Sequence, residues 1–460
     1  MDSRIRAYLQ DHRQDLLDGL AEFLRFASIA NVAADQAGQD PCRNCADWLV
    51  GQLESLGFAA RLIEATGKPH VFAEMQVDPA LPTVLVYGHY DVQPPDPLEL
   101  WKTDPFEPVI RDGAIFARGA NDNKGQFWAH ICAIRALLDG ATALPVNLKV
   151  FVEGEEEIGS PGLEDVLVEH KDLLAADYCL VSDSEFYDEK TPAITYRLRG
   201  IAAWQVKLKG PADDLHSGIH GGPVRNPLNA LSALVAAMHG PNGRVMLPGF
   251  YDDVVELTDQ ERHRWAELPF SEADYAAELG LSVEQLSGGE NGFSVLQRRW
   301  GRPTLDVNGI VGGYIQEGIK TVLPAEATVK FSTRLVPDQD PEKISRAVEQ
   351  FVAAHTPPGC RAQVRAFGAG RPVCFSPDSP GMQAGIRALR EAFGAEPALI
   401  GCGASVPVTE LFQRVLGQDV VMLGYGLPSD RIHSPNERFQ LSQLFGGAVA
   451  TACFLDQIGR

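Results

Sequence analysis

Four apolar runs of five to seven residues stand out in the hydrophobic pattern, and each stops abruptly at residues able to bind a metal. They lie within residues 83–91, 147–157, 178–185 and 420–426. Continuous apolar runs of this length are typical of strands buried on both faces, as in a largely parallel sheet covered by helices. Because ligands of such sheets bind beyond the carboxyl ends of the strands, we expect the four strand ends to meet at one site.

Two segments with apolar residues at helical spacing, 126–138 and 382–393, are candidates for the covering helices. The N-terminal residues 1–26 also space their apolar positions for one face of a helix. The pattern therefore predicts an α/β protein with a mixed, largely parallel sheet covered by helices.

The middle of the chain follows a different order. Apart from an acidic insertion at 241–292, residues 192–380 read as β-α-β-β-α-β, a split βαβ or ferredoxin-like unit, with a Gly/Pro/Ser-rich return linker at 368–380. We therefore predict a discontinuous catalytic domain, 1–191 and 381–460, into which a second domain is inserted at 192–380.

Composition narrows the classes of function. The 460 residues include 61 acidic and 40 basic side chains, so a nucleic-acid partner is not expected, because phosphates would be repelled. No apolar run approaches the roughly 18 residues of a membrane span, and the charged N-terminus does not resemble a signal peptide. These features predict a cytoplasmic protein without a membrane partner. Cys42 and Cys45 form a CxxC, for which two small helix residues are the preferred interpretation over a zinc or redox role.

Two short motifs carry possible ligands. His89 and Asp91 are two apart at a strand end, so both side chains point to the same face, and the carboxylate could orient a metal-binding imidazole. A hydrogen-bonded surface pair is the simpler alternative. In residues 118–126 two glycines bracket Asp122 ahead of a helical segment, where the alternative is a plain turn or helix N-cap.

Four carboxylates directly follow the second apolar run: Glu153, Glu155, Glu156 and Glu157. Crowded carboxylates repel one another unless cations or hydrogen bonds compensate, and a solvated acidic turn is the usual alternative. Here, however, the cluster ends a buried strand beside strands that lead to His89, Asp183 and His433. Imidazole and carboxylate ligands with little sulfur suit zinc, or a harder ion such as manganese.

Taken in order, the motifs GHYDVQP, GANDNKG, EGEEEIGS, VSDSE and IHSPNE resemble the metal-site motifs of the dinuclear metallopeptidases. That family includes carnosinases, cytosolic non-specific dipeptidases, glutamate carboxypeptidases and aminoacylases. The resemblance covers nearly the whole chain, including DLHSG and STRLVP in the inserted domain. It implies a zinc-exopeptidase-like catalytic domain with an inserted lid and dimerisation domain, and the long insertion resembles the carnosinase and dipeptidase branch.

The resemblance implies two metal sites that share one carboxylate. His89, Asp122 and Asp183 would bind one ion, and Asp122, Glu157 and His433 the other. Two divalent ions per chain are expected, with zinc preferred and manganese or cobalt as alternatives.

The same resemblance gives roles to two acidic residues near the ligands. Asp91 would orient the metal-binding His89, and Glu156 would be the general base for a water that bridges the two ions. It also implies a cis peptide bond between Asp122 and Asn123.

Four further residues match family positions that face the substrate. His216 resembles a histidine that reaches across a dimer interface to the oxyanion, and Arg334 resembles the arginine that holds a substrate carboxylate. Thr321 and Ser405 match other contact positions. A turn histidine and a surface arginine are the simpler alternatives.

We therefore expect a homodimeric metallopeptidase that hydrolyses the peptide bond of dipeptides or short peptides with a free C-terminal carboxylate. An N-acyl-amino-acid deacylase or a carboxypeptidase with the same metal centre is the main alternative. A non-catalytic metal-binding scaffold is the remaining one, although a scaffold has no need of Glu156. The sequence leaves the side-chain preference and the metal open.

Overall fold

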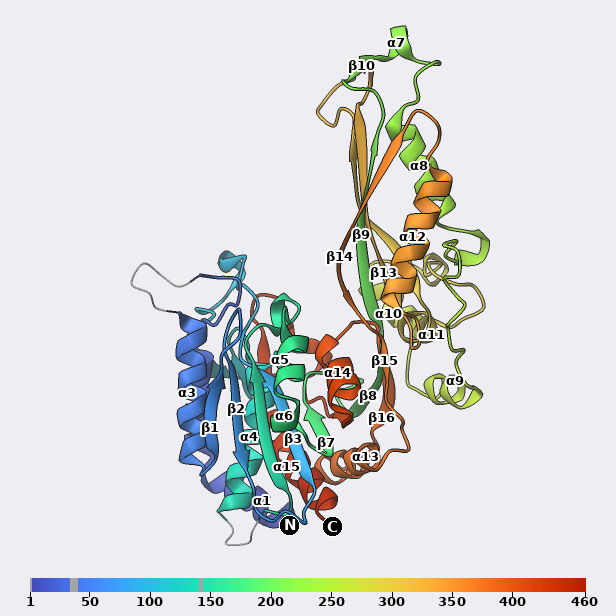
Figure 1. Cartoon of the computed structure of the whole chain (residues 1–460). Helices are drawn as coiled ribbons and strands as arrows, with labels where there is room; N and C mark the ends of the chain where they lie inside the picture. The colour runs from blue at the N-terminus through green and yellow to red at the C-terminus, as the bar shows by residue number, and fades with distance from the viewer. Residues whose placement is uncertain (1, 34–39, 140–143) are drawn as a thin grey trace. The chain divides into compact units, whose positions relative to one another are not determined.

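The computed structural model describes residues 2–33, 40–139 and 144–460. The chain divides into two compact units, labelled element by element in Figure 1. Unit 1 comprises residues 1–196, 375–400 and 408–460, and unit 2 comprises residues 197–374 and 401–407. None of the helices in the described residues has the length and apolar content that crossing a bilayer requires.

Unit 1 is built on a six-stranded sheet in the order β1-β2-β6-β3-β7-β17. The bounds are Ala59–Ile63 (β1), His70–Met75 (β2), Thr83–His89 (β3), Asn147–Glu153 (β6), Tyr178–Val181 (β7) and Asp419–Met422 (β17). The four apolar runs are β6, β3, β7 and β17, which lie side by side and pair in parallel, whereas β1 and β2 are antiparallel. The predicted mixed, largely parallel sheet is confirmed.

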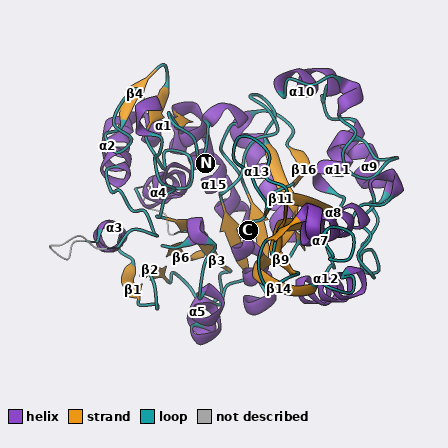
Figure 2. Ribbon diagram, turned by 90° about the horizontal axis from the view of Figure 1, so that it is seen from above, coloured by secondary structure: helices purple, strands orange, loops and turns teal. Residues whose placement is uncertain are grey.

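Helices cover this sheet, as the view from above shows (Figure 2). The helix α3 packs against β1 and β2, α4 against β3 and α13 against β17. The two segments predicted to be covering helices are α4 and α13, so these predictions are confirmed. The helices of this part are α1 (Asp2–Asp11), α2 (Arg13–Leu24), α3 (Pro41–Ser55), α4 (Lys124–Leu138), α5 (Leu163–Glu169), α6 (Lys171–Leu174), α13 (Pro380–Phe393), α14 (Pro407–Leu411) and α15 (Leu441–Ile458).

The N-terminal amphipathic segment is two helices and not one, since α1 and α2 are separated at His12, whose ψ of 14° departs from helical geometry. A small antiparallel sheet, β4 (Val109–Arg111), β5 (Ala114–Phe116) and β18 (Arg438–Gln440), pairs Arg438 with Phe116. It therefore brings the residues before 438 next to the residues after 116. A further sheet has the order β15-β8-β16, with the bounds Ala193–Leu198 (β8), Val373–Cys374 (β15) and Ala398–Cys402 (β16).

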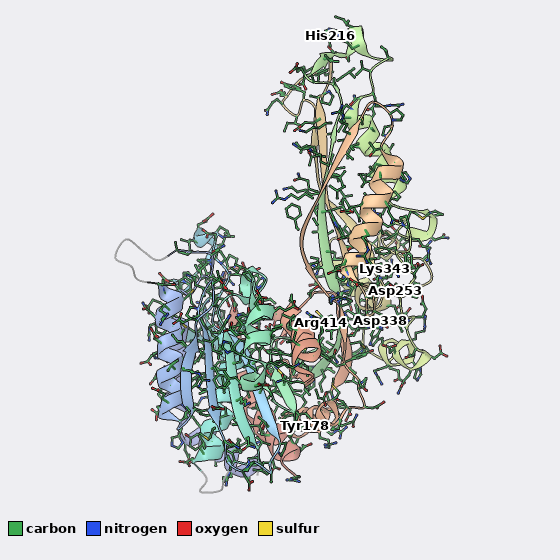
Figure 3. All side chains as sticks on the ribbon, viewed as in Figure 1. Tyr178, His216, Asp253, Asp338, Lys343 and Arg414 are labelled. Carbon is green, nitrogen blue, oxygen red and sulfur yellow. The ribbon has the colours of Figure 1, made fainter. Side chains whose placement is uncertain are left out.

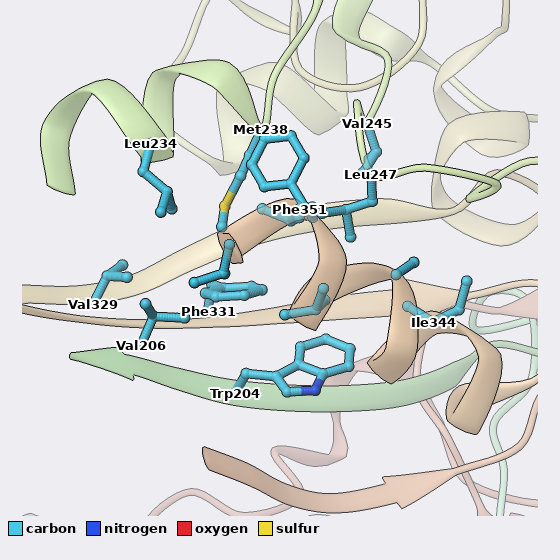
Figure 4. Packing of buried hydrophobic residues seen from close by; sticks show 14 of the residues in the cluster. Trp204, Val206, Leu234, Met238, Val245, Leu247, Val329, Phe331, Ile344 and Phe351 are labelled. Atoms are coloured by element: carbon cyan, nitrogen blue, oxygen red, sulfur yellow. The ribbon is translucent and has the colours of Figure 1, made fainter. Parts of the chain in front are cut away.

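Unit 2 contains a four-stranded antiparallel sheet in the order β11-β13-β9-β14. In chain order its elements are β9 (Gly200–Lys209), α8 (Pro227–Ala237), β11 (Thr304–Gly312), β13 (Glu326–Leu335), α12 (Pro341–His355) and β14 (Arg361–Gly370). This order is the β-α-β-β-α-β pattern of the sequence. Both helices pack on the same apolar core, in which Trp204 stacks on Phe331 beneath Met238 and Phe351 (Figure 4).

The other elements of unit 2 are β10 (Leu215–His216), α7 (Ser217–His220), α9 (Asp259–Ala266), α10 (Glu272–Glu278), α11 (Val295–Trp300) and β12 (Val322–Leu323). The return linker predicted at 368–380 is wrong in its first part. Strand β14 continues to Gly370, which pairs with Ile201, and β15 begins three residues later, at Val373. Backbone pairing with β9 therefore keeps this glycine-containing stretch extended, although its composition is that of a loop.

Candidate metal centre

The ends of adjacent strands carry the candidate ligands in unit 1. His89 is the last residue of β3, and Asp183 lies two residues beyond β7. A short 3-10 turn, Glu156–Ile158, follows β6 and contains Glu157. Asp122 lies in the loop before α4. Because β6, β3 and β7 are parallel neighbours, their carboxyl ends open at the same edge of the sheet.

The structure brings all five candidate ligands, now including His433, into two groups that share one carboxylate. His89, Asp122 and Asp183 form one group, and Asp122, Glu157 and His433 form the other, with the ligand atoms of each group within 4.8 Å of one another. Asp122 belongs to both groups, and each of its carboxylate oxygens faces the histidine of one group. Oδ1 lies 3.1 Å from His89 Nε2, and Oδ2 lies 2.8 Å from His433 Nε2. His433 Nε2 also lies 3.2 Å from Glu157 Oε2.

Asp91 connects the histidine of one group to the acidic turn. Its backbone oxygen lies 3.1 Å and its Oδ1 3.4 Å from His89 Nδ1. Its carboxylate also accepts hydrogen bonds from the backbone N–H groups of Glu156 and Glu157, at 3.2 and 3.0 Å. Asp91 thus contacts both the imidazole, through its backbone oxygen and its carboxylate, and the turn that carries the two glutamates, through its carboxylate.

Glu156 lies beside the first group, with Oε2 4.0 Å from His89 Nε2. Burial raises the pKa of its carboxyl well above the ordinary value, and the nearby Asp183 and Asp122 add to this although His89 opposes it. Burial, together with repulsion from Asp122, also raises the pKa of Asp183 to about 7.

The loop around Asp122 is fixed by the neighbouring amide. Asn123 Nδ2 donates to Ser182 O at 2.6 Å and to Asp183 Oδ1 at 3.2 Å, and its Oδ1 accepts from His89 N at 3.3 Å. The Asp122–Asn123 peptide bond is cis, as the resemblance implied. The backbone of one ligand is therefore tied to the strand ends that carry two others.

These residues fit divalent metal ions. Each group offers one imidazole nitrogen and two carboxylate oxygens, a donor set that suits zinc and other borderline ions. The negative charge is poorly compensated by the protein itself, because Asp183 and Glu156 both repel neighbouring carboxylates. In the described part of the chain, Cys42 and Cys45 belong to neither group and lie buried in α3.

The four residues predicted to face the substrate lie in unit 2, where they form two pairs. His216 ends β10 and pairs with Val322, and the N–H of Ser217 donates to the backbone oxygen of Thr321 at 3.0 Å. Exposed His216 thus lies next to Thr321 at the end of unit 2 formed by β10 and α7 (Figure 3). Arg334 Nη1 donates to Ser405 Oγ at 3.2 Å.

Three residues around these sites were not identified from the sequence. Asn123 and Glu437 stand inside the motifs GANDNKG and IHSPNE. Their closeness in sequence to the candidate ligands Asp122 and His433 was therefore a signal that could have been used. Arg199 stands inside a stretch of strand-like sequence, which gave no signal of a site. Its backbone oxygen accepts from Ser405 Oγ, and burial, together with the positive charge of Arg334, lowers its pKa to about 10.

The sheet of unit 1 is parallel at its centre, and its strand ends present two His/Asp/Glu groups that share Asp122. This fold and site define a metal-dependent hydrolase. The model of peptidase family M20/M25/M40 matches residues 85–457. The chain therefore belongs to this family and is a metallopeptidase that requires divalent metal ions.

Two dipeptidases are similar to most of the chain. The Cys-Gly metallodipeptidase dug1 of Schizosaccharomyces pombe is 34% identical over 450 residues, 94% of each chain. The Beta-Ala-His dipeptidase of Homo sapiens is 33% identical over 84% of this chain and 76% of that protein. Among solved structures, the M20 family metallo-carboxypeptidase Sso-CP2 from Sulfolobus solfataricus is 33% identical, with a TM-score of 0.83 over 96% of this chain and 99% of that one.

Proposed function

We propose that this metallopeptidase hydrolyses the peptide bond of dipeptides or short peptides that end in a free carboxylate. The observation that carries the proposal is the pair of ligand groups sharing Asp122, with the half-buried carboxyl of Glu156 4.0 Å from His89. Similarity to a Cys-Gly metallodipeptidase and to a Beta-Ala-His dipeptidase supports the choice of short peptides.

In this proposal the two ligand groups hold one divalent ion each. When bound, such ions acidify a water molecule and polarise the scissile carbonyl. Glu156, whose Oε2 lies 4.0 Å from His89 Nε2, takes the proton of the attacking water and passes it to the leaving amine. Asp91 keeps the imidazole of His89 and the turn containing Glu156 in fixed relation through its hydrogen bonds to both.

Two arginines support a carboxylate-binding role for unit 2. Arg334 and Arg199 are close enough for their positive charges to interact, and Ser405 Oγ bonds to both residues. Within the described residues no carboxylate oxygen lies within 4.0 Å of either guanidinium, although the other pairs show that such contacts are common in this chain. A pair of guanidinium groups without a carboxylate in direct contact favours an anionic ligand, and a carboxylate matches the guanidinium fork.

A carboxypeptidase acting on longer peptides is the second candidate. The observation in its favour is the 33% identity to the metallo-carboxypeptidase Sso-CP2, which spans nearly all of both chains. Both candidates need the same metal centre and the same free carboxylate, so only the length of the accepted peptide separates them.

A substrate panel tests the proposal. The protein, loaded in parallel with Zn²⁺, Mn²⁺ or Co²⁺, is incubated with free dipeptides, their C-amidated forms, longer peptides and N-acyl amino acids, and disappearance is followed by mass spectrometry. We expect free dipeptides to be hydrolysed and the C-amidated forms to survive, since the amide removes the charge that Arg334 binds. Cleavage of longer peptides from the C-terminus would select the carboxypeptidase, and preferential loss of N-acyl amino acids would select a deacylase.

We also propose that the active form is a homodimer in which the partner's His216 completes each site. The motivation is that His216 is exposed and lies in unit 2, whereas all candidate ligands lie in unit 1. Mixing Glu156→Gln with His216→Ala protein should then restore about one quarter of the wild-type turnover, because half the dimers are hybrids and each has one complete site. No recovery after subunit exchange, or full activity of a monomer in light scattering, would contradict the dimer.

Zinc is the proposed physiological metal, since a mixed imidazole and carboxylate set without thiolates suits it well. We further propose a cytoplasmic location, in keeping with eight cysteines of which none forms a disulfide. Metal analysis of protein purified without added metal, and fractionation of cells that express it, test these two points. A different bound metal, or protein recovered outside the cytoplasm, would contradict them.

A further inference from the structure

Glu437 is a fully buried carboxylate that does not belong to either ligand group. Its Oε2 accepts from Arg118 Nη1 at 2.6 Å and from the N–H of Gly119 at 3.1 Å. Its Oε1 accepts from the N–H groups of Asn121 and Asp122, at 2.9 and 3.1 Å. Three of the four donors are therefore backbone groups of one short loop, and the last of them belongs to the shared ligand itself.

The hydrogen bonds of Glu437 do more than form an ion pair with Arg118. Arg118, which is 1% exposed, balances the charge of Glu437. A carboxylate that only neutralised Arg118 would not need both oxygens directed at backbone N–H groups of residues 119, 121 and 122. Because the N–H of Asp122 is one of these donors, the position of the Asp122 backbone depends directly on Glu437.

The same segment of chain supplies the other histidine ligand. His433 stands four residues before Glu437, and Asp430 stands three residues before His433. Asp430 Oδ2 accepts from Asn121 Nδ2 at 2.8 Å and from the N–H of Leu427 at 2.9 Å. Two buried carboxylates, one on each side of His433, thus bind the loop that leads to Asp122.

We propose that Glu437 is a positioning residue of the metal centre, which holds the Asp122 loop in register with the segment that carries His433. The inference rests on the proposed dinuclear site. Since the contact runs through the backbone of Asp122, the loss of Glu437 weakens the binding of both ions, and most of all the ion that needs Asp122 and His433 together. Residues that hold a metal ligand in place through hydrogen bonds typically contribute about 10–100-fold to metal affinity.

The test is metal affinity, which does not depend on a choice of substrate. Zn²⁺ is titrated into the full chain against a fluorescent chelator, for the wild type and for Glu437→Gln, and thermal unfolding of the metal-free proteins is followed alongside. The glutamine keeps one acceptor oxygen, so it cannot serve both pairs of donors. We expect two ions in the wild type, and at least one of them bound about 10–100-fold more weakly in the variant.

Glu290→Gln is the matched control, because Glu290 is also buried and paired with an arginine, Arg302, but lies in unit 2. It should lower the unfolding temperature and leave both zinc affinities unchanged. If Glu437→Gln does not fold, the double variant Arg118→Met/Glu437→Gln takes its place in the titration. The added Arg118→Met substitution removes the charge of Arg118, which would otherwise be buried without a partner.

The outcomes distinguish a failure of the positioning role of Glu437 from a failure of the proposed dinuclear site. Two ions in the wild type, and the same affinities within twofold in the Glu437 variant, would overturn the positioning role. Fewer than two ions in the wild type would overturn the proposed dinuclear site, and this inference with it. An equal loss of zinc affinity in Glu290→Gln would show that lost stability alone explains the effect, which also overturns the positioning role.

Discussion

Replacing Glu156 by glutamine is expected to reduce turnover by about 10²–10⁴-fold, the usual contribution of a general base. Glutamine has nearly the same shape but cannot accept the proton of the attacking water. The ligand groups do not include Glu156, and Asp91 binds its backbone N–H and not its side chain. The variant should therefore keep both metal ions, and its KM should change little compared with kcat. Initial rates on a free dipeptide together with metal analysis measure both quantities.

Glu155→Gln is a matched control for this experiment, since it makes the same chemical change one residue earlier. The carboxylate of Glu155 packs against Gly67, where a Cβ atom would lie 2.0 Å from Oε1. Its activity should stay within a few-fold of the wild type. Near-native turnover in Glu156→Gln, or an equal loss in Glu155→Gln, would show that another carboxylate is the base.

The four glutamates also show where sequence reasoning ends. Their side chains face four different partners in the structure. Glu153 accepts from Tyr87 OH, Glu155 packs on Gly67, Glu156 approaches His89, and Glu157 approaches His433. Strand β6 ends at Glu153 and a 3-10 turn begins at Glu156, so the period-two alternation of the strand no longer applies. Only the resemblance to known motifs distinguished Glu156, the proposed base, from its neighbours.

The sheet was easier to predict than the contacts that hold the site together. Buried parallel strands have a local signature, and four apolar runs gave four neighbouring strands in unit 1. Asp91 instead bonds to backbone groups 65 and 66 residues away, and Glu437 to groups 315 to 318 residues away. Backbone N–H groups look the same in every residue, so no side-chain pattern signals that a distant carboxylate binds them.

Replacing Asp122 by alanine is expected to remove both metal ions and to lower turnover to background. Asp122 belongs to both ligand groups, and each of its carboxylate oxygens faces a different histidine. The hydrogen bonds from His433 and His89 also keep its pKa below the usual range in spite of burial, so it is an ionised ligand at neutral pH. Without it, each group retains only one imidazole and one other carboxylate, too few ligands for tight binding of a divalent ion.

Single-group variants make this prediction quantitative. Asp183→Ala should lose the ion of the first group and retain the second, while His433→Ala should do the reverse, because Asp183 and His433 each belong to one group. Metal content measured by mass spectrometry should therefore fall from two ions to one in either variant, and to none in Asp122→Ala. A single ion retained in Asp122→Ala would mean that the groups do not share this carboxylate. Equal losses in all three variants would mean that the two ions bind as one cooperative unit, so that the loss of any ligand releases both.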